Sequence, residues 1–256
     1  MNNFLQAKNQ DFCEDIIIEN LTVTRGKKSI YKNFSFVFEA GTVNAILAPS
    51  GAGKTTLLDC IASLIKAESG VVKIGSNNVL DSSKKKKKIE VSYLFQEPRL
   101  LPWCSLLQNC TLPLENFMSK EEAHERAVEF LCATGLKDKI EEYPGKLSGG
   151  EKQRASVARA FAIKAPVLLM DEAFQSQDII LKEQLMQLLK KLLKTEARTV
   201  VCVTHDIREA ILLADRIIVL KPTSKTISTL YIALDVLVKN FDNTSLRDKI
   251  LEIFAV

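Results

Sequence analysis

The chain has 256 residues, which is enough for one large domain or for a core with an inserted subdomain. Hydrophobic residues at 46% and charged residues at 26% are typical of a globular protein, and a net charge of +4 is too small to indicate nucleic-acid binding by itself. Apolar runs stay well below the ~18 residues of a membrane span, and Met1–Gln10 is too polar for a signal peptide. The six cysteines lack metal-ligand or disulfide spacing, so we expect a soluble intracellular protein with reduced, mostly buried thiols.

The N-terminal part predicts antiparallel strands. Asp15–Thr24 and Phe34–Phe38 alternate apolar and polar residues, which predicts a half-buried pair joined by a turn at Gly26–Lys28. Gly70–Ile74 and Asn78–Leu80 predict a second, shorter antiparallel piece.

The segment Ala48–Thr56 reads APSGAGKTT and lies between an apolar run, Val43–Leu47, and a predicted helix, Thr56–Ile65. A strand, a loop of small residues, Lys-Thr and a helix form the usual arrangement for binding phosphate. Gly51 and Gly53 let the loop turn its backbone N–H groups towards phosphate oxygens, and the helix dipole favours the same anion. The segment therefore predicts a nucleotide site.

Two side chains of this loop supply further chemistry. Lys54 can reach the β- and γ-phosphates as a point charge, and the Thr55 hydroxyl can ligate Mg²⁺. Ala48 stands where the pattern GxxxxGK[ST] has its first glycine, and an alanine fits there if its φ is negative.

The middle of the chain differs from its flanks in the structure that its sequence predicts. Lys84–Lys88 is a lysine run that indicates a solvated loop tip, with binding of acidic lipid or nucleic acid as a minor alternative. Ile89–Phe95 predicts a strand. From Glu97 to about Ala160 the sequence is mostly helical and predicts an insertion into an α/β core, with a capping box at Ser119–Glu122 and a helix over Glu151–Ala162.

The C-terminal third alternates apolar runs with helical patterns, as expected for a doubly wound parallel sheet. The predicted strands are Val167–Met170, Thr199–Val203, Ile217–Leu220 and Thr226–Asp235, and the predicted helices are Ile179–Leu193, Ile207–Leu213 and Asp242–Phe254.

Three polar residues follow the carboxyl ends of these strands, where such sheets bind ligands. Asp171 would hold Mg²⁺ directly or through water, and Glu172 would polarise an attacking water. His205 would contact the γ-phosphate as a donor or be a silent core histidine, and its place at a strand end favours the first.

A second anion-binding pattern, LSGGEKQR at Leu147–Arg154, lies in the inserted part. Ser148 offers a hydroxyl, Gly149 and Gly150 expose backbone N–H groups, and a helix follows. Two half-sites for one triphosphate in one chain predict a head-to-tail dimer, in which the second half-site of each copy covers the phosphate loop of the other.

These motifs resemble the nucleotide-binding subunits of ATP-binding-cassette (ABC) transporters over roughly Ile16–Leu220. Ala48–Thr56 is similar to Walker A, Gln96 to the Q-loop, Leu147–Arg154 to the signature, VLLMDE to Walker B, Gln175–Asp178 to the D-loop and His205 to the H-loop. LFQEPRLLPW at Leu94–Trp103 and VTHDIREAILLADRIIVL from Val203 resemble the importers for nitrate, sulfonates, taurine and thiamine-precursor pyrimidines.

The resemblance implies a P-loop NTPase (RecA-like) α/β core with an antiparallel β subdomain and an inserted α-helical subdomain. Residues 1–96 and 161–256 would form the core of a single domain, and 97–160 the helical signature subdomain. It implies an ATPase at the cytoplasmic face of a membrane that forms a homodimer on ATP binding. The implied partners are an integral membrane permease docked near Gln96 and, indirectly, an extracytoplasmic solute-binding protein, with no nucleic acid.

By position, the resemblance assigns a role to each matching residue. Glu172, His205 and Gln96 would be catalytic; Thr55, Gln96 and Asp171 would hold Mg²⁺; and Ser50, Gly51, Ala52, Gly53, Lys54, Thr55, Thr56, Arg25, Ser148, Gly149, Gly150 and Asp178 would bind ATP.

Besides Ala48, three positions depart from the family pattern. Arg25 stands where the family has an aromatic residue that stacks on adenine, and a guanidinium can also stack on a base. Ala173 replaces a proline, and Gln177 replaces a leucine that would pack across the dimer, whereas Asp178 is retained.

Two other classes of protein fit part of the sequence. A soluble ABC ATPase acting on nucleic acid or the ribosome would use the Lys84–Lys88 run, but such proteins usually have two cassettes or long coiled coils. A small-molecule P-loop kinase would explain Ala48–Thr56 and leave Leu147–Arg154 and Gln96 without a role.

Overall fold

The computed structural model describes residues 12–26, 28–49, 51–81, 91–115, 117–175, 177–222 and 230–255. They divide into two compact units. We call the part within Asn9–Lys85 and Arg198–Val256 the phosphate-loop unit, and the part within Lys86–Ala197 the signature unit. Of the sequence predictions, Ser50, Ser176 and Lys84–Lys88 lie outside the described residues.

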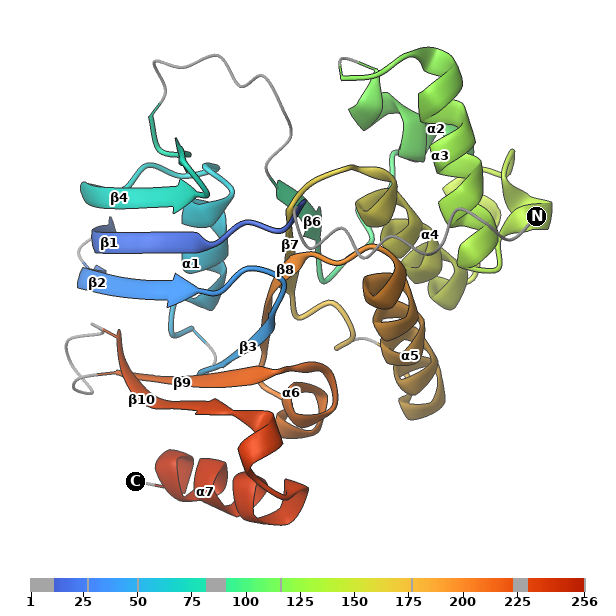
Figure 1. Cartoon of the computed structure of the whole chain (residues 1–256). Coiled ribbons are helices and arrows are strands. Elements are labelled where there is room, and N and C mark those ends of the chain that lie inside the picture. The colour runs from blue at the N-terminus through green and yellow to red at the C-terminus, as the bar shows by residue number, and fades with distance from the viewer. Residues whose placement is uncertain are drawn as a thin grey trace. The chain divides into compact units, whose positions relative to one another are not determined.

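The phosphate-loop unit contains an antiparallel sheet with the strand order β2-β1-β4-β5. Figure 1 shows its first three strands side by side. Its predicted strand pair is confirmed, because Ile16 lies opposite Phe38 and Arg25 opposite Lys28. The shorter antiparallel piece is present, since β4 pairs with β5, but its second strand is Asn77–Asn78 rather than the predicted Asn78–Leu80. The strands are β1 (Ile16–Arg25), β2 (Lys28–Phe38), β4 (Ser69–Ile74) and β5 (Asn77–Asn78).

The same unit contains strands in the order β10-β9-β3-β8. β3 is parallel to β8 on one side and to β9 on the other, and β10 pairs with β9 in the antiparallel sense. β3 and β8 consist almost entirely of buried residues, which explains their continuous apolar sequences. The elements are β3 (Val43–Leu47), β8 (Thr199–Thr204), β9 (Arg216–Pro222), β10 (Leu230–Leu237), α1 (Lys54–Ile61), α6 (Ile207–Leu213), η5 (Val238–Asn240) and α7 (Asn243–Ala255).

The helix after the phosphate loop begins and ends earlier than the sequence predicts. We expected Thr56–Ile65, whereas α1 spans Lys54–Ile61 and is followed by Ser63 with a φ of 58°. A residue in the left-handed region ends an α-helix, and the apolar Leu64 is 61% exposed beyond it. Helical spacing alone could not locate this end.

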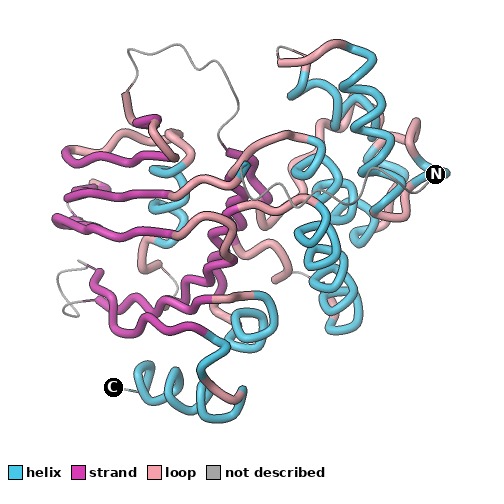
Figure 2. Tube along the Cα trace, viewed as in Figure 1, coloured by secondary structure: helices cyan, strands magenta, loops and turns pink. Residues whose placement is uncertain are grey.

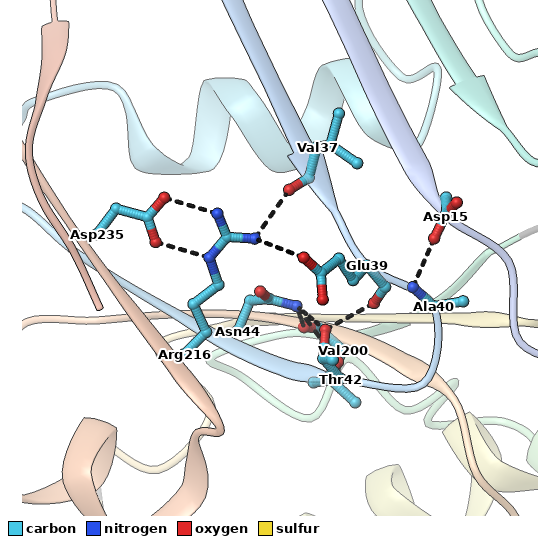
Figure 3. Close-up of polar contacts among 9 residues, drawn as sticks. All are labelled: Asp15, Val37, Glu39, Ala40, Thr42, Asn44, Val200, Arg216 and Asp235. Carbon is cyan, nitrogen blue, oxygen red and sulfur yellow. Dashed lines mark hydrogen bonds and ion pairs between the residues drawn. The ribbon is translucent and has the colours of Figure 1, made fainter. Parts of the chain in front are cut away.

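Arg216 connects β9 to both sheets of the phosphate-loop unit (Figure 3). Its guanidinium binds the two carboxylate oxygens of Asp235 on β10, each at 2.6 Å, and donates to the carbonyl oxygen of Val37 on β2 at 3.2 Å. The guanidinium also lies 4.8 Å from the centre of the Phe36 ring. The hydrogen bond to Asp235 raises the pKa of Arg216, so the guanidinium keeps its charge throughout the physiological range.

The signature unit combines a parallel strand pair with helices (Figure 2). Among its described residues, the segment from 97 to 160 contains helices and no strand, as predicted. The predicted capping box is present, since Ser119 and Glu122 exchange hydrogen bonds at the start of α3. The elements are β6 (Val91–Leu94), α2 (Leu106–Thr111), η2 (Leu112–Leu114), α3 (Lys120–Ala133), η3 (Lys137–Lys139), η4 (Pro144–Lys146), α4 (Gly149–Ala162), β7 (Val167–Asp171) and α5 (Ile179–Thr195).

The six cysteines are free thiols, as expected from their spacing. Cys60, Cys104, Cys110 and Cys202 are buried, and burial raises the pKa of Cys60 and of Cys110 to about 12. None of the helices in the described ranges has the length and apolar character that crossing a membrane requires.

Candidate active site

The phosphate loop has the backbone that its glycines require. Gly51 and Gly53 have φ values of 72° and 94°, in the left-handed region that side chains with a Cβ disfavour. Ala48 is 2% exposed and is not among the described non-glycine residues with positive φ. The alanine is therefore accommodated without backbone strain at the position where the pattern has glycine.

The Lys54 side chain folds back onto the phosphate loop. Its side chain is buried, and Nζ donates to the carbonyl oxygens of Ala48 at 3.0 Å and Pro49 at 3.2 Å. The Tyr31 hydroxyl donates to the carbonyl oxygen of Gly53 at 3.3 Å, and burial raises the pKa of this tyrosine. These contacts fix the loop and place a cation inside it.

The first turn of α1 suits an anion. Gly53 is the N-cap residue and provides no side-chain hydrogen bond, so the N-terminal N–H groups of the helix are not capped by it. Thr55 is exposed, whereas Thr56 is buried against the unit's core. Of the two threonines, only Thr55 has a side chain on the surface where a cation could reach it.

His205 emerges beside the phosphate loop. In the register of β3 and β8, Leu47 lies opposite Thr204, so Ala48 and His205 are the next residues at the same edge. His205 is exposed, which excludes the alternative of a core histidine. Its neighbours are fixed, because the Thr204 hydroxyl donates to Glu209 at 2.5 Å and Asp206 caps α6.

Arg25, at the end of β1, lies against the helix that follows the phosphate loop. Its guanidinium is 3.4 Å from a carboxylate oxygen of Asp59 on α1. The Arg25 side chain is 53% exposed, so one face of its planar group can stack on a flat ligand.

In the signature unit, Gln96, Asp171 and Glu172 gather at one edge of the strand pair. Leu94 lies opposite Met170 in the parallel register, so the chain leaves both strands at the same level. Gln96 Nε2 donates to Gln175 Oε1 at 2.7 Å, which ties the end of β6 to the turn after β7. The sequence identified Gln175 only as the first D-loop residue, and this contact with Gln96 was not predicted.

Glu172 has an unusual backbone conformation. Its φ is 46°, and its carbonyl oxygen accepts a hydrogen bond from the N–H of Gln175 at 3.1 Å. A left-handed residue with a Cβ costs about 1–2 kcal/mol, and such residues cluster at functional sites. The strained turn directs the chain sharply away from β7 at the predicted base.

The signature segment is the beginning of a helix. We expected a loop up to Gly150, whereas α4 begins at Gly149 with Ser148 as its N-cap. Ser148 Oγ accepts from the N–H of Glu151 at 3.3 Å, and Glu151 Oε2 accepts from the N–H of Ser148 at 2.9 Å. The Ser148 hydroxyl keeps its own O–H to donate to an anion.

The Glu151 carboxylate at this helix start is ionised at neutral pH. Its pKa falls to about 2, first because of the hydrogen bond from Lys139 and then because of the N–H of Ser148. The capping box is therefore fully formed at neutral pH.

The two signature glycines have different surroundings. Gly149 has an ordinary φ, and among the described residues nothing lies within 4 Å of the Cβ that it lacks. A Cβ on Gly150 would lie 2.7 Å from Leu181 Cδ2 at the start of α5. A side chain at position 150 would therefore displace the end of the Leu181 side chain, whereas the packing of the described residues gives no reason for glycine at position 149.

The D-loop positions precede α5. Asp178 is the N-cap of this helix, and its Oδ1 accepts from the N–H of Leu181 at 2.9 Å. Ala173 is buried where the family pattern has proline, and Gln177 is half-buried. Two large apolar residues, Ile179 and Ile180, follow Asp178 and are 74% and 71% exposed.

Sequence reasoning missed Gln153, the most deeply buried polar residue near Glu172. It is 0% exposed, and its Nε2 donates to the carbonyl oxygen of Ala173 at 2.5 Å. Its Oε1 is buried and has no hydrogen-bond partner among the described residues. Such an unsatisfied group costs about 1–3 kcal/mol, which sets this side chain apart from ordinary core packing.

The predicted site residues thus form separate groups within the units. The phosphate-loop unit holds Gly51, Ala52, Gly53, Lys54, Thr55, Thr56, Arg25 and His205, and the signature unit holds Gln96, Asp171, Glu172, Ser148, Gly149, Gly150 and Asp178. A lysine-bearing phosphate loop after a parallel strand, together with carboxylates at a second strand end, defines a P-loop NTPase.

Comparison with known proteins narrows this class. The sequence profile of the ABC transporter family matches residues 31–175. The aliphatic sulfonates import ATP-binding protein SsuB 1 of Mesorhizobium japonicum is 36% identical over 195 residues, covering 76% of this chain and 71% of that protein. The bicarbonate transport ATP-binding protein CmpD of Synechocystis sp. is 34% identical, with coverages of 80% and 73%.

A solved structure gives the same result. The dimeric post-hydrolysis state of the ATP-binding cassette MJ0796 bound to ADP and phosphate has a TM-score of 0.75 and 33% sequence identity, covering 88% of this chain and 100% of that one. The chain belongs to the ABC transporter family. It has the P-loop NTPase fold and is an ATP-binding subunit with ATPase activity.

Proposed function

We propose that this subunit hydrolyses Mg²⁺–ATP to power the import of a small solute, as a head-to-tail homodimer bound to a membrane permease. The observation that carries the proposal is the presence of two complementary half-sites in one chain. One is the phosphate loop with Lys54 and His205, and the other is the capped helix start at Ser148–Gly150.

Gly149 supports the idea that a second copy completes the site. Glycine in the first turn of a helix lowers its stability, and at position 149 neither a positive φ nor close packing requires it. An exposed backbone N–H beside the Ser148 hydroxyl is suited to a phosphate bound by another chain. The exposed Ile179 and Ile180 offer an apolar surface next to Asp178 for the same contact.

The donor set fits Mg²⁺. Thr55, Gln96 and Asp171 supply a hydroxyl, an amide oxygen and a carboxylate, which are the hard oxygen ligands that this ion prefers. Gln96 donates through Nε2 to Gln175, which leaves Oε1 as its atom for a cation. When bound, the ion would neutralise charge on the β- and γ-phosphates.

We assign the residues of the chain to steps of hydrolysis as follows. Lys54 and the N–H groups from Gly51 to Thr56 bind the phosphates, with Ser50 as a further ligand by position. Glu172 accepts a proton from the attacking water, and His205 donates to the γ-phosphate. Arg25 stacks on the base, held by Asp59.

The segment after Gln96 has the features of a docking surface for the permease. Trp103 is 71% exposed, and Arg99, which stacks on Phe95, is exposed as well. Arg159 donates to the carbonyl oxygens of Arg99 at 2.7 Å and Pro98 at 2.8 Å, so this surface has a fixed shape. An apolar anchor with a charged rim is typical of protein interfaces.

Part of the predicted docking segment is core. Leu94 is 1% exposed and belongs to β6, while Leu100 and Leu101 are half-buried. The exposed anchor is therefore Trp103, rather than the leucines.

The permease implies a place at the cytoplasmic face of a membrane and, indirectly, an extracytoplasmic solute-binding protein. Relatives named for aliphatic sulfonates, bicarbonate and choline support a small solute. We also propose that residues 97–160 act as the helical signature subdomain of a single domain over 1–256. The alternative of an ATPase acting on nucleic acid rests on Lys84–Lys88, which lies outside the described residues.

The proposal is tested by membrane association. Trp103→Glu should leave the ATPase of the isolated chain and its melting temperature unchanged but release it from permease-containing membranes. Phe117→Glu is the matched control, because Phe117 is a 46%-exposed aromatic residue of the same unit. Retention of the Trp103 variant on those membranes, or equal release of both variants, would contradict docking at this surface.

A further inference from the structure

Gln153 joins the signature helix to the loop that carries the predicted base. The residue lies in the second turn of α4, five positions after the N-cap Ser148. Its fully buried side chain reaches across to the carbonyl oxygen of Ala173, the residue that directly follows Glu172, at 2.5 Å. Ala173 itself is 3% exposed, so water does not compete for this bond.

Two hydrogen bonds hold consecutive carbonyl oxygens of the strained turn. The N–H of Gln175 binds the carbonyl oxygen of Glu172 at 3.1 Å, and Gln153 binds the next carbonyl along the chain. Glu172, which directly follows β7, has a φ of 46°. A backbone in a sparsely populated region persists only where its surroundings fix it, and Gln153 is the side chain that does so from α4.

We propose that Gln153 is a positioning residue for Glu172, and that it links the signature segment to the catalytic carboxylate of the same chain. The inference rests on the proposed function, because it takes Glu172 as the base and Ser148–Gly150 as the half-site for ATP bound by the other copy.

This connection has a consequence for the dimer. The first turn of α4 contacts one ATP, while the second turn of the same helix holds the base that acts on the other. A helix is stiff over so short a distance, so a displacement at Ser148 is transmitted to the carbonyl of Ala173. The two ATP sites are therefore coupled through α4, and loss of the bond should reduce the cooperativity of ATP hydrolysis.

The experiment compares steady-state hydrolysis by Gln153→Met, Gln153→Ala and Ser156→Ala. Methionine keeps the length of the side chain and removes the donor. We expect kcat to fall about 10- to 100-fold, the range for a misplaced catalytic group, with an unchanged KM for ATP and a lower Hill coefficient. ATP-dependent dimerisation should persist, because Ser148–Gly150 is intact.

Ser156→Ala is the matched control. Ser156 is a buried polar residue of the same helix, at 1% exposure, and its hydroxyl donates to the carbonyl oxygen of Gln153 within α4 at 2.8 Å. Its kcat should equal that of the wild type. Urea unfolding of each variant reports any loss of stability, and Gln153→Ala, which also removes the donor, is the second variant if Gln153→Met does not fold.

Three results would overturn the role of Gln153. They are a kcat of Gln153→Met equal to the wild type, a KM that rises in proportion to the fall in kcat, and an equal loss of kcat in Ser156→Ala. Failure of the proposed function has a different signature, because a wild-type chain that binds ATP without hydrolysing it would already exclude Glu172 as a base.

Discussion

Replacing Glu172 by glutamine tests its assignment as the general base. Glutamine has the same shape and differs in lacking a carboxylate that can accept a proton. Since Gln adopts a φ of 46° at about the same cost as Glu, the strained turn and the hydrogen bond from the N–H of Gln175 should remain. The free energy of unfolding should therefore change by no more than about 0.5 kcal/mol.

The chemical effect should be much larger than the structural one. A general base contributes about 10²–10⁴-fold to the rate, which corresponds to about 2.7–5.4 kcal/mol of barrier. ATP affinity should stay near that of the wild type, because Lys54 and the phosphate-loop N–H groups are untouched. An ATP-bound dimer should accumulate, since hydrolysis no longer discharges the closed state.

The assay is phosphate release at saturating Mg²⁺–ATP, with urea unfolding of the same samples. Glu183→Gln removes the same charge from an exposed position on α5 and should have wild-type activity. If Glu172→Gln hydrolyses ATP within a factor of about two of the wild type, Glu172 is not the base.

The remaining predictions concern three other residues. Gly149→Ala should raise the free energy of unfolding in urea by up to about 1 kcal/mol, because alanine favours a helix and its Cβ contacts no described residue. The same Cβ would obstruct a phosphate bound at Ser148–Gly150, so ATP turnover should fall at least about tenfold. Unchanged turnover would contradict the half-site. Arg216→Ala should lower the free energy of unfolding by about 1.5–3 kcal/mol, because it removes both hydrogen bonds to Asp235. Lys73→Ala, which breaks an exposed ion pair with a carboxylate, should lower it by less than about 1 kcal/mol. Equal losses would show that the Arg216 contacts add nothing. The pKa of Glu151 in the folded chain is depressed to about 2, below its ordinary value of 4.5. The capping box should therefore stabilise α4 fully at pH values above 4.5 and lose this effect as the pH falls towards 2. Titration of the Glu151 carboxyl by NMR near 4.5 would disprove this.

The sequence predicted the parts of the fold that depend on local patterns. Val43–Leu47 is buried on both faces, and its continuous apolar run indicated a parallel strand. The spacing of Ser119 and Glu122 predicted the start of α3 because a capping box is a local interaction. His205 was placed correctly beside the phosphate loop, since parallel strands bring their carboxyl ends to the same edge.

Other features escaped prediction because opposing local signals hid them. Gly149 and Gly150 read as a loop, although Ser148 and Glu151 form the same kind of capping box that identified α3. The helix α2, with its own capping box at Ser105, lies between prolines and was missed. In both cases the capping pattern was a better guide than helix propensity.

The contacts of Gln153 and Arg216 could not have been predicted from one sequence. Gln153 binds a carbonyl oxygen 20 residues away, and Arg216 joins strands that are far apart in the chain. Hydrogen bonds of this kind depend on tertiary packing, which has no periodic signature. The positive φ of Glu172 is likewise visible only in the folded chain.

The central claim is that one chain holds two half-sites and needs a second copy to complete them. Light scattering of the isolated chain, with and without Mg²⁺–ATP, tests it most directly in the Glu172→Gln background, where the closed state persists. We predict a monomer without nucleotide and a dimer with ATP. Adding Ser148→Arg should keep the chain monomeric in both conditions while ATP binding to the monomer stays near normal. A dimer that forms without nucleotide and survives Ser148→Arg would contradict the account.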